Sequence, residues 1–208
     1  MSIKWVIFDA MGVIYEVADD VSDLLIPFLR SKNNKIPLKK IYESYIEASL
    51  GHITSKEFWN NLGYIEEYPK IEEEFLDHWY TIDPEFNEVA KILKKKYKIG
   101  MLSNDLKEWS NFLRIKYNIN RYFDIAIISG EVGYRKPDKK IYELLLEKTN
   151  TKSKDIIFVD DKLENLRSAS ELGINTIRFI RIESKTPFCS EFEISSFNEL
   201  LEVIKNFF

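Results

Sequence analysis

Five short apolar runs, separated by segments with helical spacing, limit the possible folds of this chain more than any other feature. The runs cover residues 5–8, 99–102, 125–128, 156–159 and 174–180. Each has the length of a β-strand, and several lack polar–apolar alternation, as expected of strands that are covered on both faces. Strands alternating with helices predict an α/β fold with a doubly wound parallel, Rossmann-like sheet.

The segments between the later runs carry apolar residues three and four positions apart, as amphipathic helices do. Residues 84–97 begin with Pro84, which is favoured at the first helical position, and end in a cationic turn that suits the helix dipole. Residues 138–150 and 162–172 show the same spacing, and Gly173 is suited to end the second of these helices. We therefore expect helices that cover the sheet.

One long stretch after the first apolar run shows only helical patterns. The expected helices are 20–31, 38–50, 55–62 and 70–79. Thr54 and Glu57 have the spacing of a capping box at the start of the third helix. A block of roughly 60 residues is too long for a simple strand-to-helix connection. We expect a helical cap at 17–80 on a core made of 1–16 and 81–208, and such caps admit substrate and exclude water.

The composition argues against several classes of protein. Thirty Lys and Arg residues against 34 Asp and Glu residues give a net charge of −4, which disfavours nucleic acid or a membrane surface as partner. Cys189 is the single cysteine, so no intrachain disulfide and no multi-cysteine metal site is expected. No run approaches the ~18 apolar residues of a membrane span, and no secretory leader is recognisable. We expect a cytoplasmic protein, and the sequence does not indicate its oligomeric state.

Polar side chains follow four of the apolar runs. In chain order they are Asp9, Ser103 with Asn104, Lys136, and Asp160 with Asp161. Ligands of open α/β sheets bind beyond the carboxyl ends of the strands, so we expect these side chains to converge. Clustered carboxylates repel one another unless a divalent cation lies among them, and an all-oxygen ligand set suits Mg²⁺. Ser103 and Lys136 are suitable donors to a phosphoryl group, which Asp9 is then free to attack.

The order, spacing and flanks of these residues resemble the haloacid dehalogenase-like (HAD) superfamily, in its phosphatase branch with a helical cap. The resemblance covers essentially the whole chain and is strongest in SGEVGYRKPDKKIYE and IIFVDDKLENLRSASELGINTIRF. It implies that Asp9 is the nucleophile of a phospho-aspartyl mechanism, in which Lys136 pairs with both the nucleophile and the phosphoryl group. The phosphate ligands that it implies are Ser103, Asn104 and Lys136.

The same resemblance implies a Mg²⁺ site. Its ligands would be Asp9, Asp160, Asp161 and the main-chain carbonyl of Met11. Asp161 would be the more direct ligand of the acidic pair, and Asn165 and Gly12 would support the two loops. The implied function is Mg²⁺-dependent hydrolysis of a small phosphorylated metabolite.

Met11 is where the chain departs from the family pattern. Most phosphatases of the family carry a second Asp there, which protonates the leaving oxygen and later activates water. Methionine keeps the main-chain carbonyl but has no titratable group. General acid–base assistance contributes ~10²–10⁴-fold to a rate, so we expect turnover that is slow rather than absent.

Two alternatives remain open. The sequence DAMGV is similar to the D-A-Y-G-T of metal-independent haloacid dehalogenases, which however lack the acidic pair that follows the fourth run. Met11 also favours a non-catalytic protein that binds a phosphorylated ligand, whereas the retained Asp9 favours an enzyme. Near the entrance to the cap, the candidates for either substrate contacts or exposed linker positions are Tyr15, Glu16, Asp19 and Asp20.

Overall fold

The computed structural model describes residues 3–32, 35–181 and 192–205, and a six-stranded sheet lies at its centre. The strands are β1 (Trp5–Phe8), β2 (Lys98–Ser103), β3 (Ile125–Ile128), β4 (Ile156–Asp160), β5 (Asn175–Phe179) and β6 (Phe192–Ile194). Their order in space is β3-β2-β1-β4-β5-β6, and all neighbouring strands are parallel. The predicted doubly wound parallel sheet is confirmed. Cys189 lies outside the described residues.

The direction of winding changes beside β1. The sheet grows from β1 through β2 to β3 on one side, and from β4 through β5 to β6 on the other. Phe8 at the end of β1 is therefore paired with Met101 of β2 and with Val159 of β4. In open parallel sheets, ligands bind at such a switch point, beyond the carboxyl ends of the strands.

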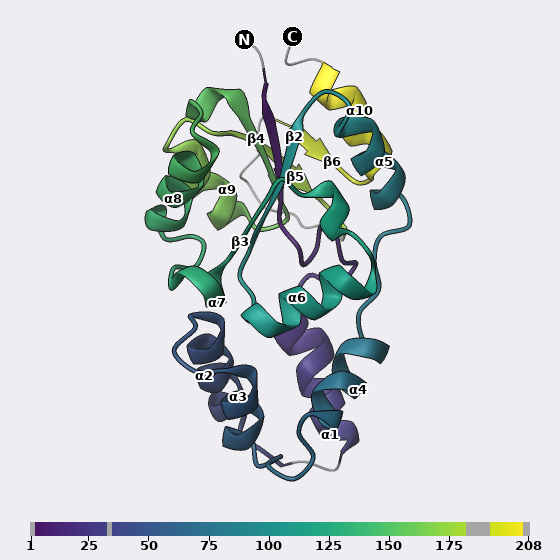
Figure 1. The fold of residues 1–208 in the computed structure, drawn as a ribbon, viewed down its shortest axis with the longest axis vertical. Helices are drawn as coiled ribbons and strands as arrows, with labels where there is room; N and C mark the ends of the chain where they lie inside the picture. The colour runs from purple at the N-terminus through teal and green to yellow at the C-terminus, as the bar shows by residue number, and fades with distance from the viewer. Residues whose placement is uncertain (1–2, 33–34, 182–191, 206–208) are drawn as a thin grey trace.

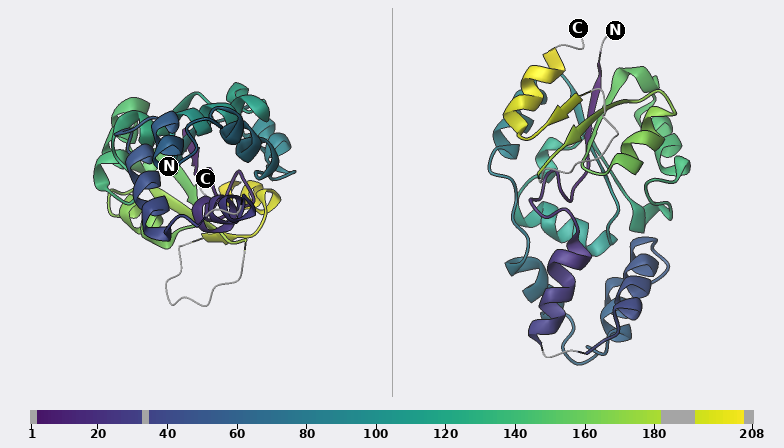
Figure 2. Two further views of the ribbon diagram at one scale, coloured as in Figure 1. Left: turned by 90° about the horizontal axis from the view of Figure 1, so that it is seen from below. Right: turned by 180° about the vertical axis from the view of Figure 1, so that it is seen from behind.

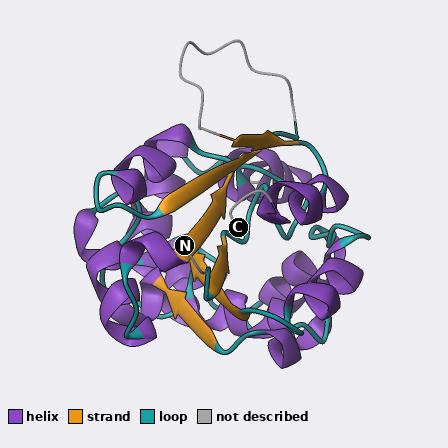
Figure 3. Cartoon of the chain, turned by 90° about the horizontal axis from the view of Figure 1, so that it is seen from above, coloured by secondary structure: helices purple, strands orange, loops and turns teal. Residues whose placement is uncertain are grey.

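Helices cover both faces of the sheet, as the views in Figures 1 and 3 show. Successive side chains of a strand point to opposite faces, so Val6 and Phe8 belong to one apolar core while Trp5 and Ile7 belong to the other. The first core is completed by α5 (Phe86–Leu93), α6 (Lys107–Lys116) and α10 (Phe197–Lys205). The second is completed by α8 (Lys139–Thr149) and α9 (Leu163–Ser170).

Short helical turns connect these elements. They are η2 (Asn120–Tyr122), α7 (Ser129–Val132) and η3 (Ser153–Asp155). The predicted helix 84–97 is shorter in the structure, because α5 ends at Leu93 and β2 begins at Lys98. No helix among the described residues is both long enough and apolar enough to cross a membrane.

A helical insert, defined here as residues 17–80, separates β1 from β2. It contains the π-helical turn η1 (Val21–Leu25), α1 (Ile26–Ser31), α2 (Leu38–Ser49), α3 (Ser55–Asn61) and α4 (Lys70–His78). Figure 1 and the right view of Figure 2 place these helices beyond one end of the sheet, where α2 packs against α7 and both α3 and α4 pack against α6. The predicted capping box of Thr54 and Glu57 is present at the start of α3.

A buried carboxylate connects the insert to the core. Glu72 on α4 accepts hydrogen bonds from Nε1 of Trp59 at 2.9 Å and from Nε1 of Trp109 at 2.8 Å. Ser55 on α3 donates to the other oxygen of Glu72 at 3.2 Å. Trp109 belongs to α6 and its ring packs against Phe75 of α4. These contacts fix α3, α4 and α6 relative to one another.

The two crossings between core and insert lie side by side. Tyr15 pairs with Ile82 in an antiparallel bridge, and the main-chain N–H of Glu16 donates to the carbonyl of Thr81 at 3.1 Å. The chain thus leaves the core and returns to it at one place.

Candidate active site

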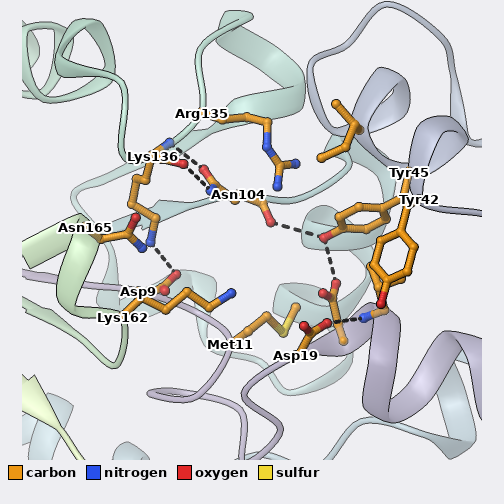
Figure 4. Close-up of a pocket in the computed structure, with 13 residues that line it drawn as sticks. Asp9, Met11, Asp19, Tyr42, Tyr45, Asn104, Arg135, Lys136, Lys162 and Asn165 are labelled. Atoms are coloured by element: carbon orange, nitrogen blue, oxygen red, sulfur yellow. Dashed lines mark hydrogen bonds and ion pairs between the residues drawn. The ribbon is translucent and has the colours of Figure 1, made fainter. Parts of the chain in front are cut away.

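The structure brings together the side chains at the ends of β1 and β4 and the lysine that follows α7. Nζ of Lys136 lies 2.7 Å from Oδ1 of Asp9 (Figure 4) and 2.7 Å from Oδ2 of Asp160, and all three residues are buried. Asp9 comes directly after β1, and Asp160 is the last residue of β4. One buried cation therefore connects carboxylates from two neighbouring strands.

Two asparagines hold this arrangement in place. Oδ1 of Asn104 accepts from the main-chain N–H of Lys136 and Nδ2 donates to its carbonyl, both at 2.8 Å. Nδ2 of Asn165 lies 3.1 Å from each carboxylate oxygen of Asp160. The main-chain N–H of Lys162 donates to the same carboxylate at 2.8 Å. Both oxygens of Asp160 are thus occupied by donors, which orient the lysine toward Asp9.

Asp161 adds a third carboxylate to Asp9 and Asp160. One oxygen from each of these three residues lies within 4.8 Å of the others. Burial raises the pKa of Asp9, and burial together with the charge of Asp160 raises the pKa of Asp161 to about 7. Oδ1 of Asp161 is buried and is without a hydrogen-bond partner among the described residues. A buried carboxylate oxygen without a partner is unfavourable unless it binds a proton or a cation, so the cluster fits a hard divalent cation such as Mg²⁺.

The loop after β1 makes room for Asp161 because residue 12 is glycine. Gly12 has a φ of +75°, and a Cβ built on it would lie 2.5 Å from Oδ2 of Asp161. The neighbouring side chain, that of Met11, is buried and lines the same space as Asp9. The thioether of Met11 has no proton to transfer, so residues 9–15 supply no carboxyl group apart from that of Asp9.

Ser103 ends β2 with a hydroxyl that makes no hydrogen bond to the described part of the chain. The residue is fully buried, and its Oγ atom has no partner there. A buried hydroxyl left in this state costs about 1–3 kcal/mol. The hydroxyl is therefore not engaged by another group of the described chain, although Ser103 is not among the residues that line the cavity described below.

A cavity of about 180 Å³ lies between the strand ends and the insert (Figure 4). Its lining residues from the core are Asp9, Met11, Asn104, Arg135, Lys136, Lys162 and Asn165, and those from the insert are Asp19, Asp20, Val21, Tyr42, Tyr45 and Ile46. This volume is smaller than the roughly 300–1,000 Å³ of pockets for drug-sized ligands, so it fits a small ligand.

The entrance residues that the sequence singled out have different locations. Asp19 and Asp20 line the cavity, whereas Glu16 is exposed. Tyr15 is buried and packs its ring near those of Tyr80 and Tyr117. Asp19 and Asp20 are therefore the two of the four that can meet a ligand.

The sequence reasoning missed six of the lining residues, which are Val21, Tyr42, Tyr45, Ile46, Arg135 and Lys162. Arg135 and Lys162 are adjacent in sequence to Lys136 and Asp161, so this proximity was a usable signal. Tyr45 lies in the middle of α2 and reaches the cavity because α2 packs on the core. No local pattern marks such a residue.

Comparison with known proteins is consistent with this site. A model of the haloacid dehalogenase-like hydrolase family matches residues 3–173. D-ribitol-5-phosphate phosphatase from Bacteroides thetaiotaomicron is 27% identical over 191 residues, which are 85% of this chain and 91% of that protein. Glyceraldehyde 3-phosphate phosphatase from Methanocaldococcus jannaschii is 29% identical over 115 residues, which are 52% of this chain and 50% of that protein. The second match therefore spans half the length of that relative.

A solved structure supports the fold assignment. The structure of a HAD family enzyme from Bacteroides thetaiotaomicron superimposes with a TM-score of 0.75 at 21% identity, covering 89% of this chain and 97% of that one. Similarity at this level of identity establishes a shared fold. The family model covers most of the chain, and this protein therefore belongs to the haloacid dehalogenase-like hydrolases.

Proposed function

We propose that this protein is a Mg²⁺-dependent phosphatase that hydrolyses a small phosphomonoester through a phospho-aspartyl intermediate on Asp9. The observation that supports this most directly is the position of Lys136, with Nζ 2.7 Å from both Asp9 and Asp160. A buried cation beside a carboxylate nucleophile is suited to bind and stabilise a phosphoryl group. A protein that merely bound a phosphorylated ligand would have no use for the nucleophile.

The residues of the acidic cluster fit a resident Mg²⁺ ion. Asp9, Asp160, Asp161 and the main-chain carbonyl of Met11 would hold it, and the unpaired buried Oδ1 of Asp161 supports this assignment. When bound, Mg²⁺ would reduce repulsion among the carboxylates and the charge on a phosphoryl group. The HAD enzyme of Bacteroides thetaiotaomicron that shares this fold has been solved in complex with magnesium and inorganic phosphate.

The contacts of Asp9 indicate which of its oxygens reacts. Oδ1 accepts from Nζ of Lys136 at 2.7 Å and from the main-chain N–H of Ala10 at 2.6 Å, so Oδ2 is left to attack phosphorus. Lys136 and the unpaired hydroxyl of Ser103 then stabilise the phosphoryl oxygens. The bond between phosphorus and the leaving oxygen breaks, and water later attacks phospho-Asp9 to release phosphate.

The size of the cavity and the relatives point to the same class of substrate. About 180 Å³ accommodates a phosphate group with a short carbon chain. The two phosphatases compared above are named for D-ribitol 5-phosphate and glyceraldehyde 3-phosphate, both small phosphorylated metabolites. We infer that the substrate is a small phosphorylated metabolite of similar size.

The test is hydrolysis of p-nitrophenyl phosphate in Mg²⁺ and in EDTA, with the first turnovers followed separately from the steady state. We expect a Mg²⁺-dependent burst, equal to the enzyme concentration, and then slow turnover. Asp9→Asn should abolish both phases, whereas Asp23→Asn, which changes an exposed carboxylate of η1, should leave both unchanged.

Two outcomes would contradict the proposal. Hydrolysis that persists in EDTA or in Asp9→Asn would exclude the metal-dependent aspartyl route. Release of halide from a 2-haloacid in EDTA, without phosphatase activity, would favour the dehalogenase that Met11 leaves open.

A further inference from the structure

Asp20 brings a buried carboxyl group to the cavity from the side of the insert. It is 7% exposed and lines the cavity together with Asp9 and Met11. It directly precedes the π-helical turn η1 (Val21–Leu25), a helix type found frequently at functional sites. Asp20 is therefore a buried carboxyl group that a ligand in the cavity can contact.

The neighbouring Asp19 has a structural task. Its Oδ1 accepts from the main-chain N–H groups of Val21 at 3.1 Å and Ser22 at 2.9 Å, which fixes the start of η1. Asp20 makes no such contact with the main chain of the described residues. Of the two adjacent carboxylates, Asp19 is half-buried and holds the main chain, whereas Asp20 is buried in the cavity wall and has no such structural task.

Tyr45 holds Asp20 in one orientation. Its hydroxyl donates to Oδ2 of Asp20 at 2.8 Å and lies 3.4 Å from the carbonyl of Asn104, the residue that fixes Lys136 (Figure 4). The guanidinium of Arg135 lies over the ring of Tyr45, 5.6 Å from its centroid. Oδ1 of Asp20 has no hydrogen bond to any residue that the structure describes. The geometry thus leaves this oxygen to exchange a proton with a ligand.

The charged and titratable groups that face Asp20 come from several elements. They are Asp19 beside it, Tyr45 on α2, Tyr80 after α4, Asp105 after β2, Arg135 before α8 and Lys162 after β4. Burial raises the pKa of Asp20 to about 6, although the hydrogen bond from Tyr45 and the charge of Lys162 act in the opposite direction. A carboxyl group that titrates near the working pH can both donate and accept a proton.

We propose that Asp20 performs the proton transfers that Met11 cannot perform, on the basis of the phosphatase function proposed above. In the first half-reaction, Asp9 bonds to phosphorus and the bond to the leaving oxygen breaks. The electron pair stays on that oxygen, which takes the proton from Oδ1 of Asp20.

The second half-reaction restores both residues. The oxygen of a water molecule bonds to phosphorus, its proton passes to the carboxylate of Asp20, and the bond between phosphorus and Asp9 breaks. Phosphate leaves, Asp9 is again ionised, and Asp20 is again protonated.

The experiment compares two substrates that differ in their need for an acid. p-Nitrophenolate leaves without protonation, whereas the phenolate of phenyl phosphate is a much poorer leaving group. In Asp20→Asn, we expect the first turnover of p-nitrophenyl phosphate to stay near the wild-type rate. The first turnover of phenyl phosphate and the steady-state rate on both substrates should fall by ~10²-fold or more.

A pH profile separates proton transfer from positioning. In the wild type, the ratio of the first-turnover rates, phenyl phosphate over p-nitrophenyl phosphate, should fall as the pH rises through about 6, because the acid form of Asp20 is lost. Dividing one rate by the other removes any pH dependence that is common to both substrates. In Asp20→Asn the ratio should not depend on pH. Asp23→Asn, an exposed change on the same turn, should behave as the wild type.

The outcomes distinguish the two proposals. Absence of Mg²⁺-dependent hydrolysis of p-nitrophenyl phosphate in the wild type would overturn the proposed function itself. Mg²⁺-dependent hydrolysis in the wild type, with Asp20→Asn as fast as the wild type on phenyl phosphate, would overturn the role of Asp20 alone. Equal losses on both substrates would also overturn it, since they would indicate positioning. The size of the p-nitrophenyl phosphate burst reports how much of each variant is correctly folded.

Discussion

Nζ of Lys136 lies 2.7 Å from Oδ1 of Asp9, and both side chains are buried at the carboxyl edge of the sheet. The same ammonium group lies 2.7 Å from Asp160, so a single cation compensates two carboxylates. Removing one partner of a buried ion pair is more harmful than removing the whole pair, because it leaves a buried charge uncompensated.

Lys136→Met should therefore lower stability as well as activity. We expect the free energy of unfolding to fall by about 3–5 kcal/mol when it is measured by urea denaturation in EDTA. Lys139→Met is the matched control, because Lys139 pairs with Glu171 on the surface and its loss should change little. A Lys136→Met variant as stable as this control would contradict the buried ion pair.

Gly12→Ala should weaken metal binding through a steric clash. A Cβ at this position would lie 2.5 Å from Oδ2 of Asp161, and the φ of +75° is itself unfavourable for alanine. Gly63→Ala is the control, since Gly63 has a φ of +93° but no atom within 4 Å of a built Cβ. Both variants should lose about 1–2 kcal/mol of stability. Titration calorimetry with Mg²⁺ should show weaker binding for Gly12→Ala alone, and equal affinities would argue against the assigned site.

Glu72→Ala should loosen the contact between the insert and the core. The change removes the acceptor of two buried indole N–H groups, those of Trp59 and Trp109, and each unpaired donor costs about 1–3 kcal/mol. Urea denaturation monitored by tryptophan fluorescence measures the loss. Glu73→Ala changes an exposed neighbour on the same helix and should leave the urea concentration at the midpoint of unfolding unchanged. If the two variants unfolded at the same urea concentration, Glu72 would not be the connecting group.

Asp20→Asn should change how stability depends on pH. Burial raises the pKa of Asp20 from 3.8 to about 6, so between these values the folded protein holds a proton that the unfolded chain releases. Stability therefore falls as the pH rises through this interval, by about 3 kcal/mol in total, and asparagine removes this loss.

The measurement is urea denaturation of both proteins at several pH values from 4 to 7.5. The variant should gain stability relative to the wild type as the pH rises, and the difference should level off above pH 7. Asp23→Asn, which removes an exposed carboxylate of the turn that follows Asp20, is the matched control. A constant difference between Asp20→Asn and the wild type at all pH values would contradict a protonated, buried Asp20.

The sheet could be predicted because its strands are covered on both sides. Val6 and Phe8 enter one core while Trp5 and Ile7 enter the other, so β1 is an unbroken apolar run in the sequence. β6 (Phe192–Ile194) has three residues with Glu193 exposed at its centre, so no apolar run marks it. α10, which follows it, was missed as well.

The location of the site could be predicted for a related reason. Asp9, Ser103 and Asp160 lie at strand ends, and a parallel sheet places all such ends at one edge. Tyr45 of α2 and Asp20 meet in the cavity through a hydrogen bond between residues 25 positions apart in the sequence. Sequence patterns describe local periodicity and do not encode such contacts.

The two segments that connect the insert to the core are paired at Tyr15 and Ile82. Because the insert begins and ends at neighbouring points of the core, an insert of another length can replace it without any change in the order of the strands. The entropy of closing such a loop grows only with the logarithm of its length, and large changes in size are therefore tolerated. The part of the cavity wall that the insert supplies can thus diverge while the phosphoryl-transfer chemistry proposed for the sheet edge is kept unchanged.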